Sequence, residues 1–243
     1  MARGPDNPKE LFPGIIADYQ RVFGDDLVSV ILYGSAAGRD YVPGKSDINF
    51  MIVLSETGIN DLDRAFETVR KWRKQRVAVP LFLTETYVET SLDVFPIEYL
   101  NFRQAYVVAF GKDILKDLVI DREFLRLQCE REIKGKLLLL RQAFLETGGR
   151  GRGLRELIGQ SLSAFVAIFK ALLHLRETEI PGGKKDVIRE TCRAFQLKPD
   201  AFETVWGMRA GNIKLSDAGA TRAFKDYLRE VRRLAKQVDA MGE

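Results

Sequence analysis

Glycine and serine stand at positions 34 and 35, directly after the mostly apolar segment Val28–Tyr33, and an aspartate follows at position 47 after eleven intervening residues. Glycine lets the backbone approach a phosphate closely, and the N–H groups at a helix start attract negative charge. The Asp47 carboxylate can serve as an oxygen ligand of a divalent metal ion. These residue types at this spacing indicate a site for a phosphate group and a metal. A purely structural alternative is that Asp47 caps the turn after Gly44.

The position two residues after Asp47 holds Asn49, where a metal site would favour a second carboxylate. Because side chains alternate along a strand, residues 47 and 49 are expected on one face. An amide oxygen can bind Mg²⁺, but it carries no charge. At about 4 Å and an effective dielectric constant near 20, one unit charge acting on another is worth roughly 4 kcal/mol before desolvation. Asn49 therefore predicts weaker metal binding than an aspartate would give.

The first half of the chain alternates between helix and strand patterns, which is typical of a small sheet domain. The expected helices cover residues 8–24 and 58–75, and the expected strands cover residues 28–33, 48–54, 80–83, 95–100 and 105–110. One face of the second helix is expected to carry Leu62, Phe66, Val69 and Trp72. The strands over 28–33 and 48–54 position the Gly-Ser turn and Asp47.

After residue 118 the sequence pattern becomes helical. Residues 121–146 are amphipathic, and residues 154–175 are apolar almost all round, as expected of a central bundle helix. Further helices are expected near 184–195 and 219–240, and the glycine-rich segment 148–153 is expected to be a linker. We therefore predict an α+β protein, with a small mixed-sheet domain over residues 1–118 and a helical bundle domain over residues 119–243.

The composition excludes several classes of protein. The 243 residues are 46% hydrophobic and 30% charged, which is typical of a globular chain and not of a disordered one. The net charge of +4 fits a polyanionic ligand but is too small to indicate a nucleic-acid partner. We find no signal-peptide pattern and no run of roughly 18 uninterrupted apolar residues. We therefore expect a soluble, cytoplasmic protein without a membrane partner.

The strand, the Gly-Ser pair, the spacing and Asp47 together resemble the pattern of the nucleotidyltransferase superfamily of DNA polymerase beta and kanamycin nucleotidyltransferase. The resemblance is specific over residues 28–54 and extends in layout to about residue 118. It implies a nucleotidyltransferase-like sheet domain that uses Mg²⁺ as cofactor and ATP or another nucleoside triphosphate as co-substrate. The helical domain is then expected to bind the second substrate or to form a homodimer.

The resemblance also implies roles for individual residues. Gly34 and Ser35 would hold the phosphates, and Asp47 would be a catalytic metal ligand, with Asn49 at the second ligand position. Further candidates for contact with the triphosphate are the loop residues Arg39, Lys45 and Ser46 and, in the helical domain, Arg126 and Lys134.

The family takes a third catalytic and metal-binding acid from a neighbouring strand. We assign this role to Glu98, within the expected strand over 95–100, because an ionised carboxylate among apolar neighbours needs a metal or a cation. Asp93 is the alternative candidate for the third acid. A structural alternative is that the Glu98 carboxylate forms an ion pair with an arginine such as Arg103 and binds no metal.

The implied reaction is attack by a hydroxyl of a small molecule or a protein on the α-phosphate of the nucleoside triphosphate, with release of pyrophosphate. Asn49 leaves two interpretations open. One is a transferase that uses a magnesium ion brought in by the nucleotide. The other is a catalytically silent nucleotide-binding protein, either a regulator or an antitoxin-like partner.

Overall fold

The computed structural model describes residues 4–38, 40–149 and 151–242, and these form two compact units. The first unit comprises the described parts of Met1–Asp93 and Glu98–Ile120. The second comprises those of Val94–Ile97 and Asp121–Glu243. Each unit has its own core, and each is described below by itself.

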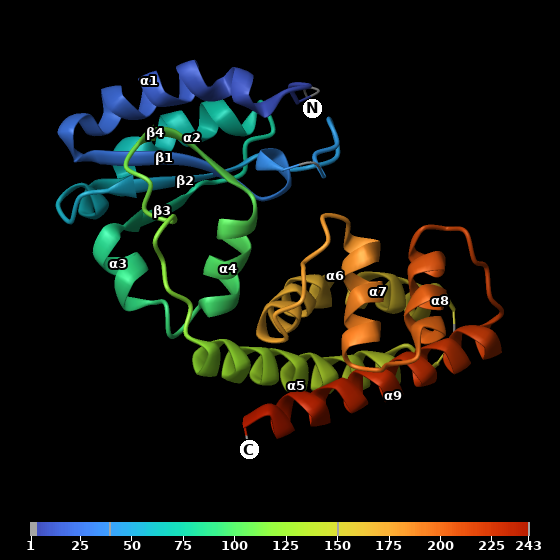
Figure 1. The fold of residues 1–243 in the computed structure, drawn as a ribbon. Coiled ribbons are helices and arrows are strands. Elements are labelled where there is room, and N and C mark those ends of the chain that lie inside the picture. Colours follow the sequence, from blue (N-terminus) through green and yellow to red (C-terminus); the bar gives the residue numbers. More distant parts are fainter. Residues whose placement is uncertain (1–3, 39, 150, 243) are drawn as a thin grey trace. The chain divides into compact units, whose positions relative to one another are not determined.

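The first unit is built on a sheet in the order β3-β2-β1-β4 (Figure 1). Its strands are β1 (Leu27–Tyr33), β2 (Asn49–Leu54), β3 (Leu81–Thr84) and β4 (Tyr106–Gly111). β1 is antiparallel to both β2 and β4, whereas β2 and β3 are parallel. The predicted mixed sheet is confirmed, and the whole chain has the predicted α+β class.

Helices cover both faces of this sheet because β1 and β2 are apolar on both faces (Figure 1). One face carries Val30 and Phe50 and packs against α1 (Phe12–Phe23) and α2 (Phe66–Arg73). The other face carries Ile31 and Met51 and packs with residues of α3 (Glu85–Thr90) and α4 (Pro96–Gln104). A rigid sheet buried on both sides is a suitable support for a site at its edge.

Two predictions about local structure in this unit are wrong. The segment predicted as a strand over 95–100 belongs to helix α4. The single helix predicted over 58–75 is divided into a 3-10 segment, Gly58–Ala65, and helix α2, because the backbone is non-helical at Asp61. As a result Phe66, which was expected on the buried face, is 66% exposed, whereas Trp72 is buried.

A buried carboxylate joins α1 to α2. Asp18 on α1 has a side chain only 5% exposed, and it accepts hydrogen bonds from the Lys71 ammonium and from Nε1 of Trp72, the latter at 3.0 Å. Arg21 lies 3.1 Å from its other oxygen. Burial raises the pKa of Asp18, but the hydrogen bonds and positive charges outweigh burial, so the pKa lies below its ordinary value.

Replacement of Asp18 by asparagine is therefore expected to lower the free energy of unfolding at pH 7 by about 1.5–3 kcal/mol. The lowered pKa means that the folded state gains stability from the carboxylate above pH ~4 and loses it as the pH falls through the folded-state pKa. Urea unfolding at pH 7 and pH 3 should show a smaller pH dependence for Asp18→Asn than for the wild type. Equal pH dependence in the two proteins would contradict this role.

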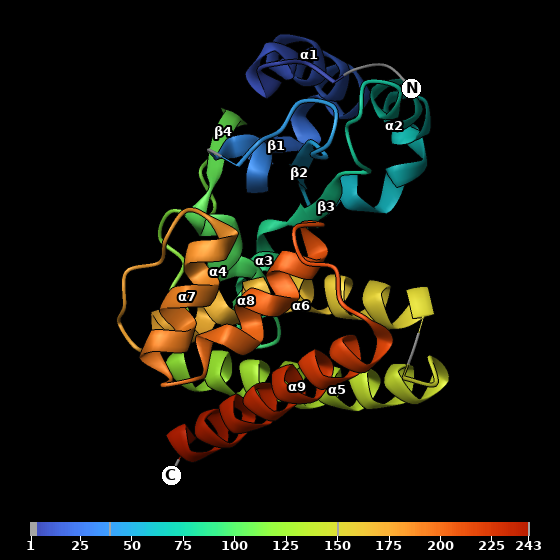
Figure 2. The ribbon, with the colours of Figure 1, turned by 90° about the vertical axis from the view of Figure 1, so that its right-hand side faces the viewer.

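The second unit is helical, with α6 (Gly151–Leu175) at its centre (Figure 2). α6 packs against α5 (Arg122–Glu146), α7 (Lys184–Ala194), α8 (Pro199–Arg209) and α9 (Asp217–Asp239). The predicted helices are present. However, α8 was not predicted, and α6 begins inside the segment predicted as a linker. α5 and α9 lie side by side in both views (Figures 1 and 2).

By length and hydropathy alone, the described part of α6 could cross a membrane. The segment Gly153–Leu175 has a mean hydropathy of 1.5, and 56% of it is buried inside the structure. The core helix of a soluble protein has the same properties, so this is weak evidence for a membrane span. The expected cytoplasmic location stays a prediction.

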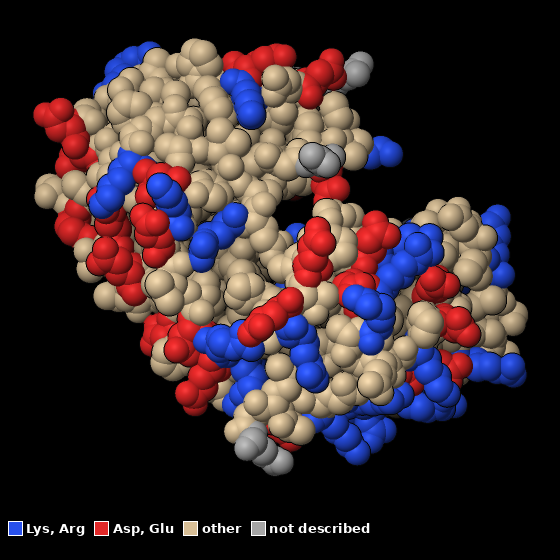
Figure 3. Space-filling model, in the orientation of Figure 1, with Lys and Arg blue, Asp and Glu red and all other residues tan. Residues whose placement is uncertain are grey.

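The two units differ in charge. The sequence of the first unit has 14 basic and 17 acidic residues, and that of the second has 24 basic and 17 acidic residues. In the second unit, basic side chains gather along its lower edge in Figure 3, where Figure 1 draws α9. The exposed cations of α9 are Arg222, Lys225, Arg229, Arg232, Arg233 and Lys236.

Candidate functional site

The Gly-Ser turn follows β1 directly. Gly34 opens a short 3-10 segment, Gly34–Ala37, with a φ of +75°, a conformation that favours glycine. Its N–H donates to the carbonyl oxygen of Ala105 at 2.9 Å, so this amide is already used within the protein. Ser35 is half-buried in the next position. The turn is thus fixed by backbone contacts, and the Ser35 hydroxyl is the side-chain group that it offers to a ligand.

Asn49 lies against this turn. It is the first residue of β2 and pairs with Tyr33, the last residue of β1. A Cβ atom placed on Gly34 would lie 3.7 Å from Nδ2 of Asn49. The structure therefore brings Gly34, Ser35 and Asn49 together at one end of the sheet, where the Cβ of a larger residue would only touch the Asn49 amide and the positive φ is what favours glycine.

The loop before β2 carries the other predicted residues. The Ser46 hydroxyl oxygen accepts a hydrogen bond from the Val42 N–H at 3.0 Å, which closes a turn, and Lys45 is exposed. Asp47 is also exposed and precedes the strand instead of opening it. Among the described residues, none forms a hydrogen bond or an ion pair with its carboxylate. Asp47 is therefore open to a ligand.

The predicted third acid does not stand on a strand. Glu98 lies in the first turn of helix α4 and is exposed, and Asp93 is exposed in the segment before that helix. The strand was predicted because apolar residues, Ile97 and Tyr99, alternate with the charged Glu98. In the structure Pro96 starts a helix instead, and Ile97 and Tyr99 are both buried in it. Glu98 thus lacks the strand position on which its metal role was predicted.

The strand next to β2 carries no carboxylate either. β3 reads Leu-Phe-Leu-Thr, and Leu81 pairs with Met51, two residues beyond Asn49. At this edge Val79 is 59% exposed and Leu81 is 38% exposed. Apolar side chains therefore occupy the places beside Asn49 where a metal site would need an acid.

The donor set does not fit a pair of protein-held magnesium ions. In the described part of the chain, no group of three or more histidine, cysteine, aspartate or glutamate side chains is placed to hold a metal. Asp47 and the Asn49 amide remain as oxygen donors. Mg²⁺ keeps several waters and is commonly bound by one or two carboxylates together with substrate phosphates. The site fits at most one ion of that kind, brought in by a nucleotide.

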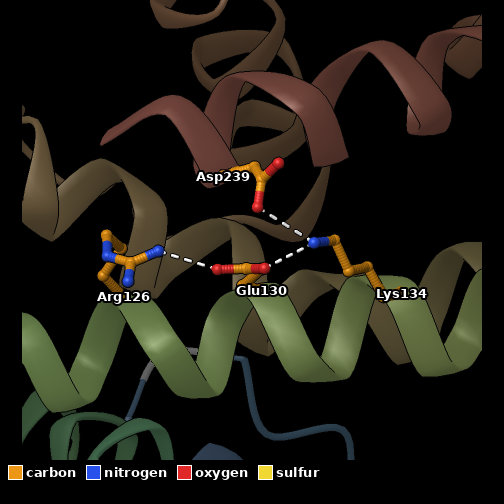
Figure 4. Close-up of polar contacts among 4 residues, drawn as sticks. All are labelled: Arg126, Glu130, Lys134 and Asp239. Atoms are coloured by element: carbon orange, nitrogen blue, oxygen red, sulfur yellow. Dashed lines mark hydrogen bonds and ion pairs between the residues drawn. The ribbon is translucent and has the colours of Figure 1, made fainter. Parts of the chain in front are cut away.

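The other predicted cations lie outside the described residues or in the second unit. Arg39 lies outside the described residues. Arg126 is paired with Glu130 at 2.7 Å, and Lys134 bridges Glu130 and Asp239 (Figure 4). Arg126 and Lys134 therefore stabilise the contact of α5 with the end of α9, which explains their presence without a ligand.

Two tyrosines near the site are held in their neutral form. Burial raises the pKa of Tyr33, whose ring packs edge-to-face on Phe102 with 4.8 Å between centroids. Burial also raises the pKa of Tyr41, despite the opposing effect of the nearby Arg76 charge. The Tyr41 hydroxyl donates to the Pro5 carbonyl oxygen at 2.8 Å. Neither tyrosine can act as a base near neutral pH.

Sequence analysis missed the cations that line a pocket together with Asp47. A pocket of about 660 Å³ is lined by Asp47 together with Arg73, Lys74, Arg76 and the segment 77–79. Ser35 is not among its lining residues. The signal that could have revealed these cations is the run Lys-Trp-Arg-Lys-Gln-Arg at 71–76, which holds four cations within six residues.

The fold is similar to that of a known enzyme, although the sequence alone reveals no relative. No family model and no curated protein matches the sequence. The crystal structure of spectinomycin adenyltransferase AAD(9) from Enterococcus faecialis with ATP and spectinomycin matches with a TM-score of 0.51 and 10% sequence identity. The match covers 90% of this chain and 99% of that one. The chain therefore has a nucleotidyltransferase-like fold, as its sequence motif predicted.

Proposed function

We propose that this chain binds a nucleoside triphosphate beside the Gly34-Ser35 turn and does not perform the two-metal transfer reaction. The observation that carries this proposal is the donor set at the sheet edge. One carboxylate, Asp47, stands there, with Asn49 at the second ligand position and the apolar residues of β3 beside it. In this reading the protein is a nucleotide-dependent regulator that has kept the fold of a transferase.

The binding half of the proposal rests on the fold and the turn. The structural neighbour was solved with ATP, and this chain retains the Gly-Ser pair next to Asn49 and an Asp47 side chain open to solvent. Asp47 and Asn49 would supply oxygen atoms to a magnesium ion, which would neutralise phosphate charge. The Ser35 hydroxyl would donate a hydrogen bond to a phosphate oxygen.

A second candidate function is slow transfer of a nucleoside monophosphate to a hydroxyl of a small molecule. The likeness to the adenyltransferase favours it, because the match extends over 90% of this chain and therefore includes helical elements of the second unit. This candidate predicts pyrophosphate release that depends on an acceptor, whereas the leading proposal predicts binding without release.

Calorimetric titration with ATP and Mg²⁺ tests the proposal. Asp47→Ala is expected to weaken magnesium-dependent ATP binding by about 10-fold or more, which corresponds to about 1.4 kcal/mol for each factor of ten. The loss is expected because the site then retains no charged oxygen donor for the ion. Asp93→Ala is the matched control, since Asp93 is an exposed acid outside the site, and it should bind like the wild type.

A pyrophosphate-release assay in a small-metabolite extract separates the two candidates. The leading proposal predicts no release by the wild type over hours with any of the four common nucleoside triphosphates. Release that disappears in Asp47→Ala would establish the second candidate instead. If the wild type binds none of the four nucleotides, both candidates are wrong.

A further inference from the structure

The pocket beside Asp47 is positively charged, although the unit that contains it has more acidic than basic residues. Its lining residues are Asp47, Arg73, Lys74, Arg76, Val77, Ala78 and Val79, and we call it the basic pocket. All of them belong to the first unit. The lining therefore combines three cations and one carboxylate with a short apolar wall.

The cations of the basic pocket have no acidic partner among the described residues, unlike the cations one turn earlier on α2. Arg70 is paired with Glu67 at 2.8 Å, and Lys71 is paired with the buried Asp18. Arg73 and Lys74 form no such pair with any described residue. The charges of Arg70 and Lys71 are thus neutralised within the fold. The charges of Arg73 and Lys74, at the C-terminal end of α2, are available to an external anion.

Arg76 is held in a strained backbone conformation. Its φ is +67°, which residues with a side chain rarely adopt. The strain is fixed by hydrogen bonds to neighbouring segments. The Arg76 N–H donates to the Arg73 carbonyl at 3.2 Å, and the Ile48 N–H donates to the Arg76 carbonyl at 3.3 Å. Because Ile48 directly follows Asp47, these bonds fix the wall of the pocket against the start of β2.

The Arg76 guanidinium also contains an unused donor. Its Nε atom is buried and has no hydrogen-bond partner among the described residues. A buried donor without a partner destabilises the folded state. The positive φ itself belongs to the end of α2, because the Val77 N–H donates to the Trp72 carbonyl at 3.3 Å and closes a helix-ending turn with Arg76 in its left-handed position. An unpaired guanidinium on a residue that lines a pocket is suited to bind an anion.

We propose that the basic pocket binds the phosphate end of a second small ligand, a phosphorylated molecule other than the nucleotide. Guanidinium groups match phosphate oxygens with paired hydrogen bonds, and an ammonium adds a further charge. Val77, Ala78 and Val79 offer an apolar surface for the rest of the ligand. That this ligand lies next to a nucleotide rests on the proposed function, because Asp47 borders both places. The anion site itself does not depend on it.

Calorimetric titration of the full chain with inorganic pyrophosphate tests the site. The double variant Arg73→Gln/Lys74→Gln is expected to weaken binding at least 10-fold, since it removes two exposed, unpaired charges without disturbing the core. Arg76→Gly is expected to weaken binding as well, because glycine accepts the positive φ while the guanidinium is lost. Arg70→Gln is the matched control, a cation on the same helix that lies outside the pocket, and it should bind like the wild type.

Comparison with ATP and Mg²⁺ distinguishes the possible sources of phosphate. Ser35→Ala should weaken ATP binding and leave pyrophosphate binding unchanged, and pyrophosphate should still bind after saturation with ATP. If ATP displaces pyrophosphate, the pocket holds the nucleotide's own phosphates and the proposal of a second ligand is wrong. It is equally wrong if the wild type does not bind pyrophosphate, or if Arg70→Gln weakens binding as much as the double variant. Pyrophosphate binding that depends on Arg73 and Lys74 without any ATP binding would refute the proposed function and support the anion site.

Discussion

Replacement of Asn49 by aspartate is expected to strengthen magnesium-dependent binding of ATP by on the order of 10- to 100-fold, or about 1.4–2.8 kcal/mol. Asn49 lies against the Gly-Ser turn and follows Asp47 by two residues, so the new carboxylate would add one charge beside the ion. The Coulomb attraction at an effective dielectric constant near 20 is larger than this, but desolvation of the carboxylate cancels part of it. Titration with ATP at fixed Mg²⁺ measures the difference.

The same variant should respond to removal of the metal. Without Mg²⁺, the carboxylates at 47 and 49 repel each other, so Asn49→Asp should melt at a lower temperature than the wild type in a chelator and recover when Mg²⁺ and ATP are added. Asn49→Ala is the control, since it removes the amide oxygen without adding charge and should show no such recovery. If Asn49→Asp binds ATP like the wild type, residue 49 does not face the bound phosphates.

Gly111→Ala is expected to lower the free energy of unfolding of the first unit by about 3 kcal/mol or more. Gly111 ends β4 with a φ of +77°, and a Cβ atom there would overlap the carbonyl oxygen of Val28 and lie 3.1 Å from the Cα of Ser29. Both groups belong to the backbone of the central strand, so neither can move without breaking the pairing of β1 with β4. Thermal unfolding should shift by more than about 10 °C.

Gly44→Ala separates the clash from the cost of the backbone conformation. Gly44 has almost the same φ, +76°, but a Cβ atom placed on it would meet no other group within 4 Å. Its replacement by alanine should therefore cost about 1 kcal/mol, the penalty for a positive φ alone. Equal stability of the two variants would mean that β4 does not approach Val28 as closely as the structure shows.

The sequence predicted the parts of the fold that have a strong and regular pattern. β1, β2 and β4 are apolar and contain β-branched residues, α9 is long and amphipathic, and α5 is long with buried residues at helical spacing, so these elements could be recognised. The Gly-Ser motif with Asp47 identified the nucleotidyltransferase-like fold, because its spacing is specific even where overall identity to the structural neighbour is 10%.

The sequence failed where patterns are short. α4 was mistaken for a strand because a brief apolar stretch fits either period, and Pro96 at its start was the stronger signal. α8 also begins with a proline, Pro199, and was missed because its apolar residues do not follow a clear helical period. The segment from Gly151 was expected to be a linker, but helix α6 begins there, because packing of the helix outweighs the low propensity of glycine.

The candidate site was less predictable than the fold. Gly34 and Asn49 meet because β1 and β2 are neighbours, which follows from the motif. The pocket beside Asp47 is lined by the cations Arg73, Lys74 and Arg76, which lie at the end of α2 and in the turn that follows it. The path of that turn depends on the positive φ of Arg76. Nothing in the residue type indicates such a conformation, so this contact could be found only in three dimensions.

The short segment Val94–Ile97 belongs to the helical unit, although the chain on both sides of it belongs to the sheet unit. Ile97 is buried there, and its backbone N–H donates to Oε1 of Gln128 at 2.8 Å. The polypeptide therefore crosses between the units three times. If the chain were cut at residue 118, the N-terminal fragment would contain Ile97 without the helical unit to which it belongs. Gln128 in the other fragment would lose the hydrogen bond from the Ile97 N–H. Neither half can be released intact by a single proteolytic nick, and separate expression of either half would require rebuilding this four-residue insertion.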